Sequence, residues 1–226
     1  MADLGDGFIG LMADSHGNLE ATRKAIGLLK RRGADTLFHL GDFCDSVRHD
    51  RTAAMLELLE AHDVLTVKGN NDFLVENMLA DSRRSLDPTG RRMLSLLRDT
   101  PLTRSFNGLR FAHSLPFDSL RSFYEPIDTG DTQRAERLFA ETDFQLLFCG
   151  HSHLPIIFRQ SCGRVTREQS SPCEKRVLGA ACGGPRPGAD QGNRDRFIVV
   201  VGAADEGECA LYNQQAGGYE RLRIFE

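Results

Sequence analysis

Seven side chains that can bind a metal ion lie at the ends of short apolar runs in the sequence. They are Asp14, His16, Asp42, Asn70, His113, His151 and His153. Imidazole nitrogen suits zinc, iron, copper and nickel, whereas carboxylate oxygen suits harder ions such as manganese. Seven donors are too many for one tetrahedral ion. They fit two ions that share a bridging carboxylate, and Asp42, in the middle of the set, is the natural bridge.

Such a pair of ions would serve hydrolysis at phosphorus. Two ions roughly 3.5–4 Å apart polarise a phosphoryl group and lower the pKa of a bound water, which supplies hydroxide near neutral pH. A glycine directly precedes three of the donors, at Gly41, Gly69 and Gly150. We expect these glycines to let the backbone approach the ions closely.

Each motif taken singly has an ordinary explanation. An Asp-x-His tripeptide is common, Gly-Asp after a strand is usually a turn or a helix cap, and Asn-Asn-Asp usually marks a turn. Pairs of histidines in loops are often solvated. The joint occurrence of these motifs, in order and at strand ends, favours the metal site.

The elements that must position the donors alternate between strand and helix in the first half of the chain. Their carboxyl ends would meet in the crevice where open α/β sheets bind ligands. This βαβαβ order predicts a parallel or mixed sheet flanked by helices. We expect strands over 8–12, 36–40 and 64–67, and helices over 19–33, after a cap at Asn18, and over 53–61.

The second half becomes richer in strands. The pattern predicts helices over 91–98 and 133–140, a hairpin over 102–106 and 109–112, and a strand over 145–149. Further short strands are expected over 156–159, 176–180, 197–201, 208–212 and 220–225, with loops over 161–175 and 183–195. No long linker separates the halves, so we expect one domain, residues 1–226, with two sheets.

Composition excludes several classes of protein. The 226 residues include 28 basic and 32 acidic side chains, a net charge of −4, which argues against a disordered chain and against a module that binds duplex nucleic acid. No apolar run approaches 18 residues, so no membrane-spanning helix is expected. The sequence MADLGDG at the start does not resemble a signal peptide. Six cysteines without a CxxC pair predict a reducing, cytoplasmic location.

The motifs together resemble those of a known family. Asp14-x-His16, Gly41-Asp42-x-x-Asp45, Gly69-Asn70-Asn71-Asp72, His113 and Gly150-His151-x-His153 are similar to the five blocks of the calcineurin-like metallophosphoesterase superfamily. The compact length and strand-rich end, with Gly183-Gly184-Pro185-Arg186, resemble its small prokaryotic phosphodiesterase branch. The resemblance implies an α/β fold in which two mixed β-sheets pack as a sandwich with flanking helices, in four αββα layers.

The resemblance also implies a distribution of the ligands over two divalent transition-metal ions. Asp14, His16, Asp42 and His153 would hold the first ion, and Asp42, Asn70, His113 and His151 the second, with Asp42 as the bridge. Manganese is favoured, and iron, nickel, cobalt or zinc would also suit these donors. Asp42, Asn70, Asn71 and His113 are the residues expected to act in catalysis.

The sequence departs from the family pattern in two places. Many members have a histidine after the metal-binding asparagine, where it contacts the phosphate and protonates the leaving group. Asn71 stands there in this chain, and an amide can donate a hydrogen bond but cannot act as a general acid. The second departure is Ala180-Ala181, where the small branch tends to have Gly-Ser.

The loop after His113 is the expected place for substrate selection. Arg121 could pair with a phosphate and Tyr124 could stack on a base, although an ordinary surface loop would look the same. The substrate would be a phosphate-ester small molecule or a nucleotide. A protein phosphatase and a dinucleoside-polyphosphate hydrolase are alternatives, and a non-catalytic scaffold, which needs no complete donor set, is less favoured. The oligomeric state stays open.

Overall fold

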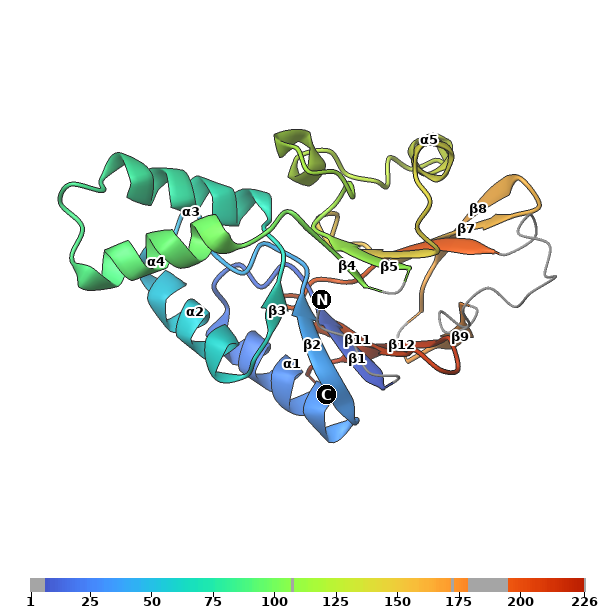
Figure 1. Ribbon diagram of the computed structural model, residues 1–226. Helices are drawn as coiled ribbons and strands as arrows, with labels where there is room; N and C mark the ends of the chain where they lie inside the picture. The colour runs from blue at the N-terminus through green and yellow to red at the C-terminus, as the bar shows by residue number, and fades with distance from the viewer. Residues whose placement is uncertain (1–6, 107, 172, 179–194, 226) are drawn as a thin grey trace.

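The computed structural model describes residues 7–106, 108–171, 173–178 and 195–225. Two six-stranded sheets lie against each other, and both mix parallel with antiparallel pairs (Figure 1). The first sheet has the order β3 (Leu65–Thr66), β2 (Ala34–His39), β1 (Phe8–Met12), β11 (Glu208–Asn213), β12 (Gly218–Arg223) and β9 (Lys175–Val177). The second has the order β4 (Thr103–Phe106), β5 (Leu109–Ala112), β6 (Leu146–Cys149), β10 (Arg196–Val200), β7 (Ile156–Ser161) and β8 (Arg164–Gln169).

Aromatic side chains fill the space between the sheets. The rings of Phe38 on β2 and Phe111 on β5 stack with centroids 3.9 Å apart, and Phe148 on β6 meets Tyr212 on β11 edge-on at 5.1 Å. All four side chains are buried in one apolar cluster. Alternate residues of the central strands point into this layer, and the residues between them are buried on the outer faces, which explains the apolar runs in the sequence.

Helices cover the outer faces of the sandwich. In α1 (Leu19–Arg31), Ala25, Ile26 and Leu29 pack against the first sheet, and in α5 (Gln133–Glu141), Leu138 and Phe139 pack against the second. The resulting αββα order is the fold class expected from the sequence. The remaining helices are α2 (Thr52–Ala61), α3 (Asn70–Asp81), α4 (Pro88–Asp99) and the short turns η1 (His49–Arg51) and η2 (Leu120–Phe123).

Local signals set several helix ends. Asn18 caps α1 as predicted, because its side chain accepts a hydrogen bond from the Ala21 amide at 3.1 Å. Asp87 caps α4 in the same way through the Gly90 amide at 2.7 Å, and Pro88 occupies the first turn. The helix therefore begins before the predicted start at Arg91.

One predicted loop contains a strand, one helix was not predicted, and one predicted strand is shorter than expected. Residues 161–175 were expected to form a loop, but they contain β8, a strand at the edge of the second sheet. The helix α3 was not predicted, because Asn-Asn-Asp is typical of a turn. The strand expected over 176–180 ends at Val177, and residues 179–194, which include Ala180-Ala181, lie outside the described residues. No helix in the described part is long and apolar enough to cross a membrane.

Candidate metal centre

The seven predicted donors meet where strands from both sheets end. Asp14 and His16 follow β1, Asp42 follows β2, and Asn70 opens α3 after β3. His113 follows β5, and His151 and His153 follow β6. These five strands run parallel within their sheets, so their carboxyl ends point the same way. Each sheet therefore contributes donors to one centre.

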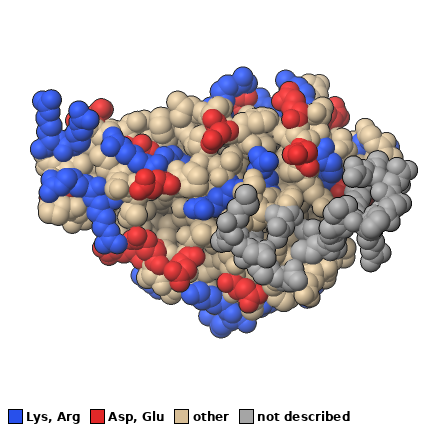
Figure 2. All heavy atoms as spheres, viewed as in Figure 1, with Lys and Arg blue, Asp and Glu red and all other residues tan. Residues whose placement is uncertain are grey.

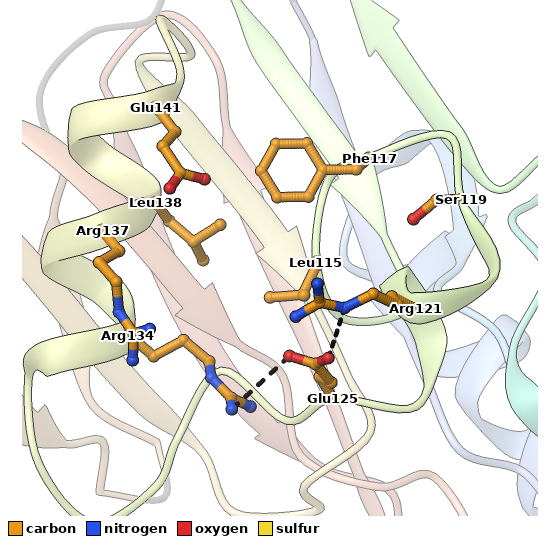
Figure 3. A pocket seen from close by; sticks show the side chains of 9 residues that line it. All are labelled: Leu115, Phe117, Ser119, Arg121, Glu125, Arg134, Arg137, Leu138 and Glu141. Carbon is orange, nitrogen blue, oxygen red and sulfur yellow. Dashed lines mark hydrogen bonds and ion pairs between the residues drawn. The ribbon is translucent and has the colours of Figure 1, made fainter.

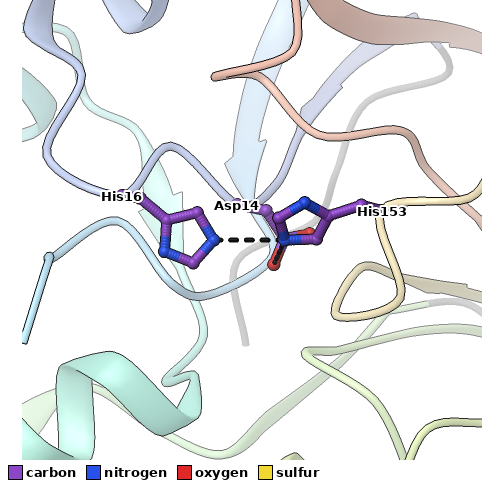
Figure 4. A group of neighbouring side chains, drawn as sticks. All are labelled: Asp14, His16 and His153. Atoms are coloured by element: carbon purple, nitrogen blue, oxygen red, sulfur yellow. Dashed lines mark hydrogen bonds and ion pairs between the residues drawn. The ribbon is translucent and has the colours of Figure 1, made fainter.

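The first group of donors consists of Asp14, His16 and His153, shown in Figure 4. The Nε2 atoms of the two imidazoles are 3.1 Å apart, and His153 Nε2 lies 3.7 Å from Asp14 Oδ1. Neighbouring ligands that each lie about 2.1 Å from one ion are separated by roughly 3.0–3.4 Å. The spacing of the two imidazoles is therefore that of ligands to a common ion.

The second group surrounds His113. Its Nε2 atom is 3.1 Å from His151 Nδ1, 3.1 Å from Asn70 Oδ1 and 3.6 Å from Asp42 Oδ1. The Asn70 oxygen is also 3.1 Å from His151 Nδ1. If the Asn70 amide were reversed, it would donate to both imidazoles and to the Phe123 carbonyl. A metal ion among these atoms would favour the orientation in which Asn70 Oδ1 faces the two imidazoles. The amide nitrogen has no free electron pair to offer an ion.

Asp14 supplies the direct evidence that a cation fits here. Its Oδ2 atom accepts a hydrogen bond from the His151 amide at 2.9 Å, but its Oδ1 atom is buried with no hydrogen-bond partner among the described residues. Burial raises the pKa of the Asp14 carboxyl well above its usual value, and the nearby Asp42 charge raises it further. A buried carboxylate oxygen without a donor is costly, and a metal ion satisfies it. The residues present therefore fit a metal ion.

Hydrogen bonds on the far side of two imidazoles fix which nitrogen faces the centre. His113 Nδ1 lies 2.9 Å from the Leu40 carbonyl and donates to it, and His153 Nδ1 lies 3.1 Å from Glu206 Oε1. The Tyr124 backbone lies close to the His151 ring and acts to raise its pKa. Partners of this kind hold metal-binding histidines in the right tautomer. Glu206 was not predicted from the sequence, because it lies far along the chain from His153.

The charge state of the site also suits metal binding. Burial lowers the pKa of His113 and lowers that of His151 to about 4, so both rings are neutral at pH 7. Burial raises the pKa of Asp42, but the His113 ring and hydrogen bonds from Asn71 outweigh burial, and the net shift is downward. The centre thus offers neutral imidazoles beside the Asp42 carboxylate.

Strained backbone is concentrated at the donors. Among the described residues, eight other than glycine have a positive φ angle, and five of these are predicted ligands. They are Asp14 (52°), His16 (42°), Asp42 (55°), His151 (74°) and His153 (58°). This conformation costs of order 1–3 kcal/mol for a residue with a side chain, and it persists where surrounding structure enforces it. The fold therefore holds five ligands in a conformation that residues with a side chain adopt only rarely.

Two of the glycines that precede the donors make room for ligand side chains. A Cβ atom on Gly69 would lie 2.1 Å from Asp42 Oδ1, and one on Gly150 would lie 2.5 Å from Asp14 Oδ2. Both distances are far below van der Waals contact. These two glycines therefore leave room for the Asp42 and Asp14 carboxylates. The sequence suggested a less specific role, in which the glycines let the backbone approach the ions.

Asp72 ties two ligand loops together, a role the sequence analysis missed. Its buried carboxylate accepts backbone hydrogen bonds from Asp42, Cys44 and Gly69, each at 2.8 Å. Burial and the neighbouring Asp42 raise its pKa to about 7. The position of Asp72 indicates this role. It is the third residue of α3, and an acidic side chain at that position often accepts a hydrogen bond from the backbone amide of the residue before the helix.

We expect Asp72→Asn to weaken metal binding about 10- to 100-fold, as loss of a group that orients ligands typically does. An asparagine offers one accepting oxygen, so its amide group must face a backbone N–H of a ligand loop. Calorimetric titration with Mn²⁺ measures the affinity, and circular dichroism confirms the fold. Asp81→Asn, at the exposed end of the same helix, is the matched control. Equal affinities for both variants would contradict this role.

The three residues expected to contact substrate have different surroundings. Asn71 donates through Nδ2 to Asp42 Oδ2 at 2.7 Å and accepts from Ser46 Oγ at 2.6 Å, so it lies at the centre. Tyr124 is 48% exposed and borders the centre through its carbonyl. Arg121 instead pairs with Glu125 at 2.6 Å and lines a separate pocket, to which none of the seven donors contributes.

A family model matches most of the chain. The calcineurin-like phosphoesterase superfamily domain matches residues 8–170, well over half of the chain. The chain belongs to this superfamily. The matched region of the chain contains all seven donors and ends after β8, so β9 to β12 complete both sheets beyond it.

Several solved structures share the fold of this chain. A metallophosphoesterase from Sphaerobacter thermophilus is similar with a TM-score of 0.72 and 21% identity, covering 97% of this chain and 88% of that one. A putative diadenosine tetraphosphatase has a TM-score of 0.56 and 14% identity, over 100% and 97%. The protein TT1561 of Thermus thermophilus has a TM-score of 0.50 and 15% identity, over 97% and 99%. No functionally curated protein matches the chain.

Proposed function

We propose that this phosphoesterase hydrolyses phosphodiester bonds, and phosphomonoester bonds as a second class, at a centre of two divalent ions. The observation that carries the proposal is the buried, unpartnered Asp14 oxygen between two groups of donor atoms in the described part of the chain. Asp14, His16, Asp42 and His153 would hold one ion, and Asp42, Asn70, His113 and His151 the other. When bound, the ions supply an activated hydroxide and neutralise charge on the phosphoryl group.

Manganese is the ion we propose for the centre. Three of the seven donors offer oxygen, from Asp14, Asp42 and Asn70, and the other four are imidazoles. Mixed sets of this kind also accept iron, nickel, cobalt or zinc, and availability decides among them. A substrate panel run on metal-free protein, with each ion added back separately, tests the reaction and the metal together. Absence of hydrolysis with every ion would overturn the proposed function.

The chain's own residues would position the substrate. Asn71 is held between Ser46 and Asp42, so its amide is oriented before the substrate arrives. Its second N–H can donate to a phosphate oxygen. The half-exposed Tyr124 ring would lie against an aromatic part of the substrate, such as a base. We assign Arg121, the third expected contact, to the neighbouring pocket described below.

The nature of the leaving group should control the rate. Asn71 cannot release a proton, so we expect aryl esters such as bis(4-nitrophenyl) phosphate to react about 10²-fold faster than alkyl esters, beyond the difference seen in solution. Asn71→His should accelerate the alkyl ester more than the aryl ester. Single-turnover rates measure the chemical step, and metal content is measured alongside. Similar rates for both esters in the wild type would show that another group supplies the proton.

A small-molecule substrate in the cytoplasm agrees best with the remaining features. Basic and acidic side chains are interspersed over most of the face in Figure 2, and basic ones gather at the end formed by the α3–α4 connection. Cys44, Cys149 and Cys209 are buried thiols, which suits a reducing compartment. A protein phosphatase is disfavoured by Asn71, because alkyl phosphoesters need a proton donor, and a scaffold has no need of a complete donor set.

A further inference from the structure

A second hollow lies on the far side of the loop that follows His113. Its volume is about 330 Å³. Figure 3 shows that its lining side chains come from this loop and from helix α5. Its floor is apolar, formed by Leu115, Phe117 and Leu138. Ligand pockets for small organic molecules commonly begin at roughly 300 Å³ and combine such a floor with a few charged groups.

Three arginines face the hollow from opposite walls. Arg121 extends from the loop toward α5, and Arg134 and Arg137 come from α5 itself (Figure 3). The carboxylates on the lining are Glu125 and Glu141, so the cations outnumber them. Glu125 is shared, because it lies 2.6 Å from Arg121 and 3.6 Å from Arg134.

Arg137, like Arg121, has hydrogen-bond donors to spare. Its Nε donates to the Gln133 carbonyl at 3.5 Å, and its two terminal nitrogens have no hydrogen-bond partner within the described parts of the chain. Arg134 donates to the Pro126 carbonyl, which holds its guanidinium at the hollow. Two guanidinium groups on adjacent turns of one helix repel each other, and an anion between them would remove this repulsion.

We propose that this hollow is a second binding site, for an organic phosphate of about nucleoside-monophosphate size. Arginine donates two parallel hydrogen bonds to phosphate, so Arg134, Arg137 and Arg121 suit the charged end of such a ligand. Phe117 and the two leucines suit a base or another apolar group. Because none of the seven metal donors lines the hollow, binding there does not depend on the ions.

The site is mechanically connected to the metal centre. Ser114, next to His113, donates to the Glu125 carbonyl at 2.5 Å, and the Leu115 amide donates to the Ser122 carbonyl at 2.7 Å. The Tyr124 backbone lies close to the His151 ring. A phosphate that draws Arg121 away from Glu125 therefore acts on a segment that touches two metal-binding histidines. The ligand could be the distal part of a substrate or a separate effector, and both have the same chemistry.

The test is calorimetric titration of the metal-free, full-length protein with adenosine 5′-monophosphate. We expect saturable binding, at least 10-fold weakening in Arg137→Ala and in Arg121→Ala, and partial recovery in Arg137→Lys. Arg23→Ala, exposed on α1, should bind as the wild type does. Inorganic phosphate or adenosine alone should bind more weakly than the nucleotide. No saturable heat, or equal affinities in all variants, would overturn the proposal.

Kinetics of the metal-loaded protein then show whether the ligand is the distal part of a substrate or a separate effector. If the ligand is the distal part of a substrate, Arg137→Ala raises KM for a dinucleotide diester but not for bis(4-nitrophenyl) phosphate. If it is an effector, the monophosphate changes the turnover of bis(4-nitrophenyl) phosphate in the wild type and not in Arg137→Ala. Because the binding measurement needs neither metal nor turnover, its failure is distinguishable from failure of the proposed hydrolase function.

Discussion

Removal of divalent ions should abolish phosphoesterase activity, with a loss of at least about 10³-fold. Metal ions contribute several kcal/mol of charge stabilisation and also generate the nucleophile, so no side chain of the centre can replace them. The measurement is the hydrolysis of bis(4-nitrophenyl) phosphate before and after chelation, with recovery on adding Mn²⁺.

Elemental analysis supplies a second measurement that does not depend on turnover. We expect close to two ions per chain after loading, and far fewer in the His113→Ala variant, whose lost Nε2 atom stands 3.1 Å from two other donor atoms. Full activity in the presence of chelator, together with the absence of specific metal, would contradict the proposed centre.

Asp42→Asn should reduce kcat/KM about 10²- to 10³-fold, and more than Asn70→Ala does. A bridging carboxylate serves both ions, whereas Asn70 serves one, so loss of the Asp42 charge disturbs both sites together. Asp42 also accepts two hydrogen bonds from Asn71, from its amide at 2.8 Å and its side chain at 2.7 Å. The rates and the metal content of both variants are compared with those of the wild type.

The control for Asp42→Asn is Asp35→Asn, near the opposite end of the same strand β2. Asp35 accepts from the Phe8 amide, and an asparagine oxygen can keep that hydrogen bond. Because Asp14 also approaches both groups of donors within 4.8 Å, Asp14→Asn is measured in parallel. If Asp14→Asn loses both ions and Asp42→Asn only one, Asp14 is the bridge.

Much of the fold and the centre was predictable because the signals are local. Each donor follows an apolar strand within a few residues, and the order of strands and helices specifies which ends meet. The cap at Asn18 is likewise a short-range pattern, and the structure confirms it. Side chains that can bind a metal at strand ends can therefore be recognised from the sequence without knowledge of the packing.

The features that were missed depend on tertiary contacts. Helix α3 begins with Asn-Asn-Asp, which favours a turn in isolation, but the Asp72 carboxylate stabilises its first turn together with the neighbouring loop. Strand β8 has no buried residue, so it lacks an apolar pattern and forms through pairing with β7. Glu206 reaches His153 only when β10 and β11 bring their connection to the centre.

The donors to each proposed ion come from both sheets, and this division has a thermodynamic consequence. Asp14, His16, Asp42 and Asn70 follow strands of the first sheet, whereas His113, His151 and His153 follow strands of the second. Each ion would therefore be a cross-link that unfolding must break. Linkage then stabilises the folded chain by about 2.7 kcal/mol per ion when free metal is 100 times its dissociation constant. The metal supply of the cell would thus control both how fast this protein works and how long it survives.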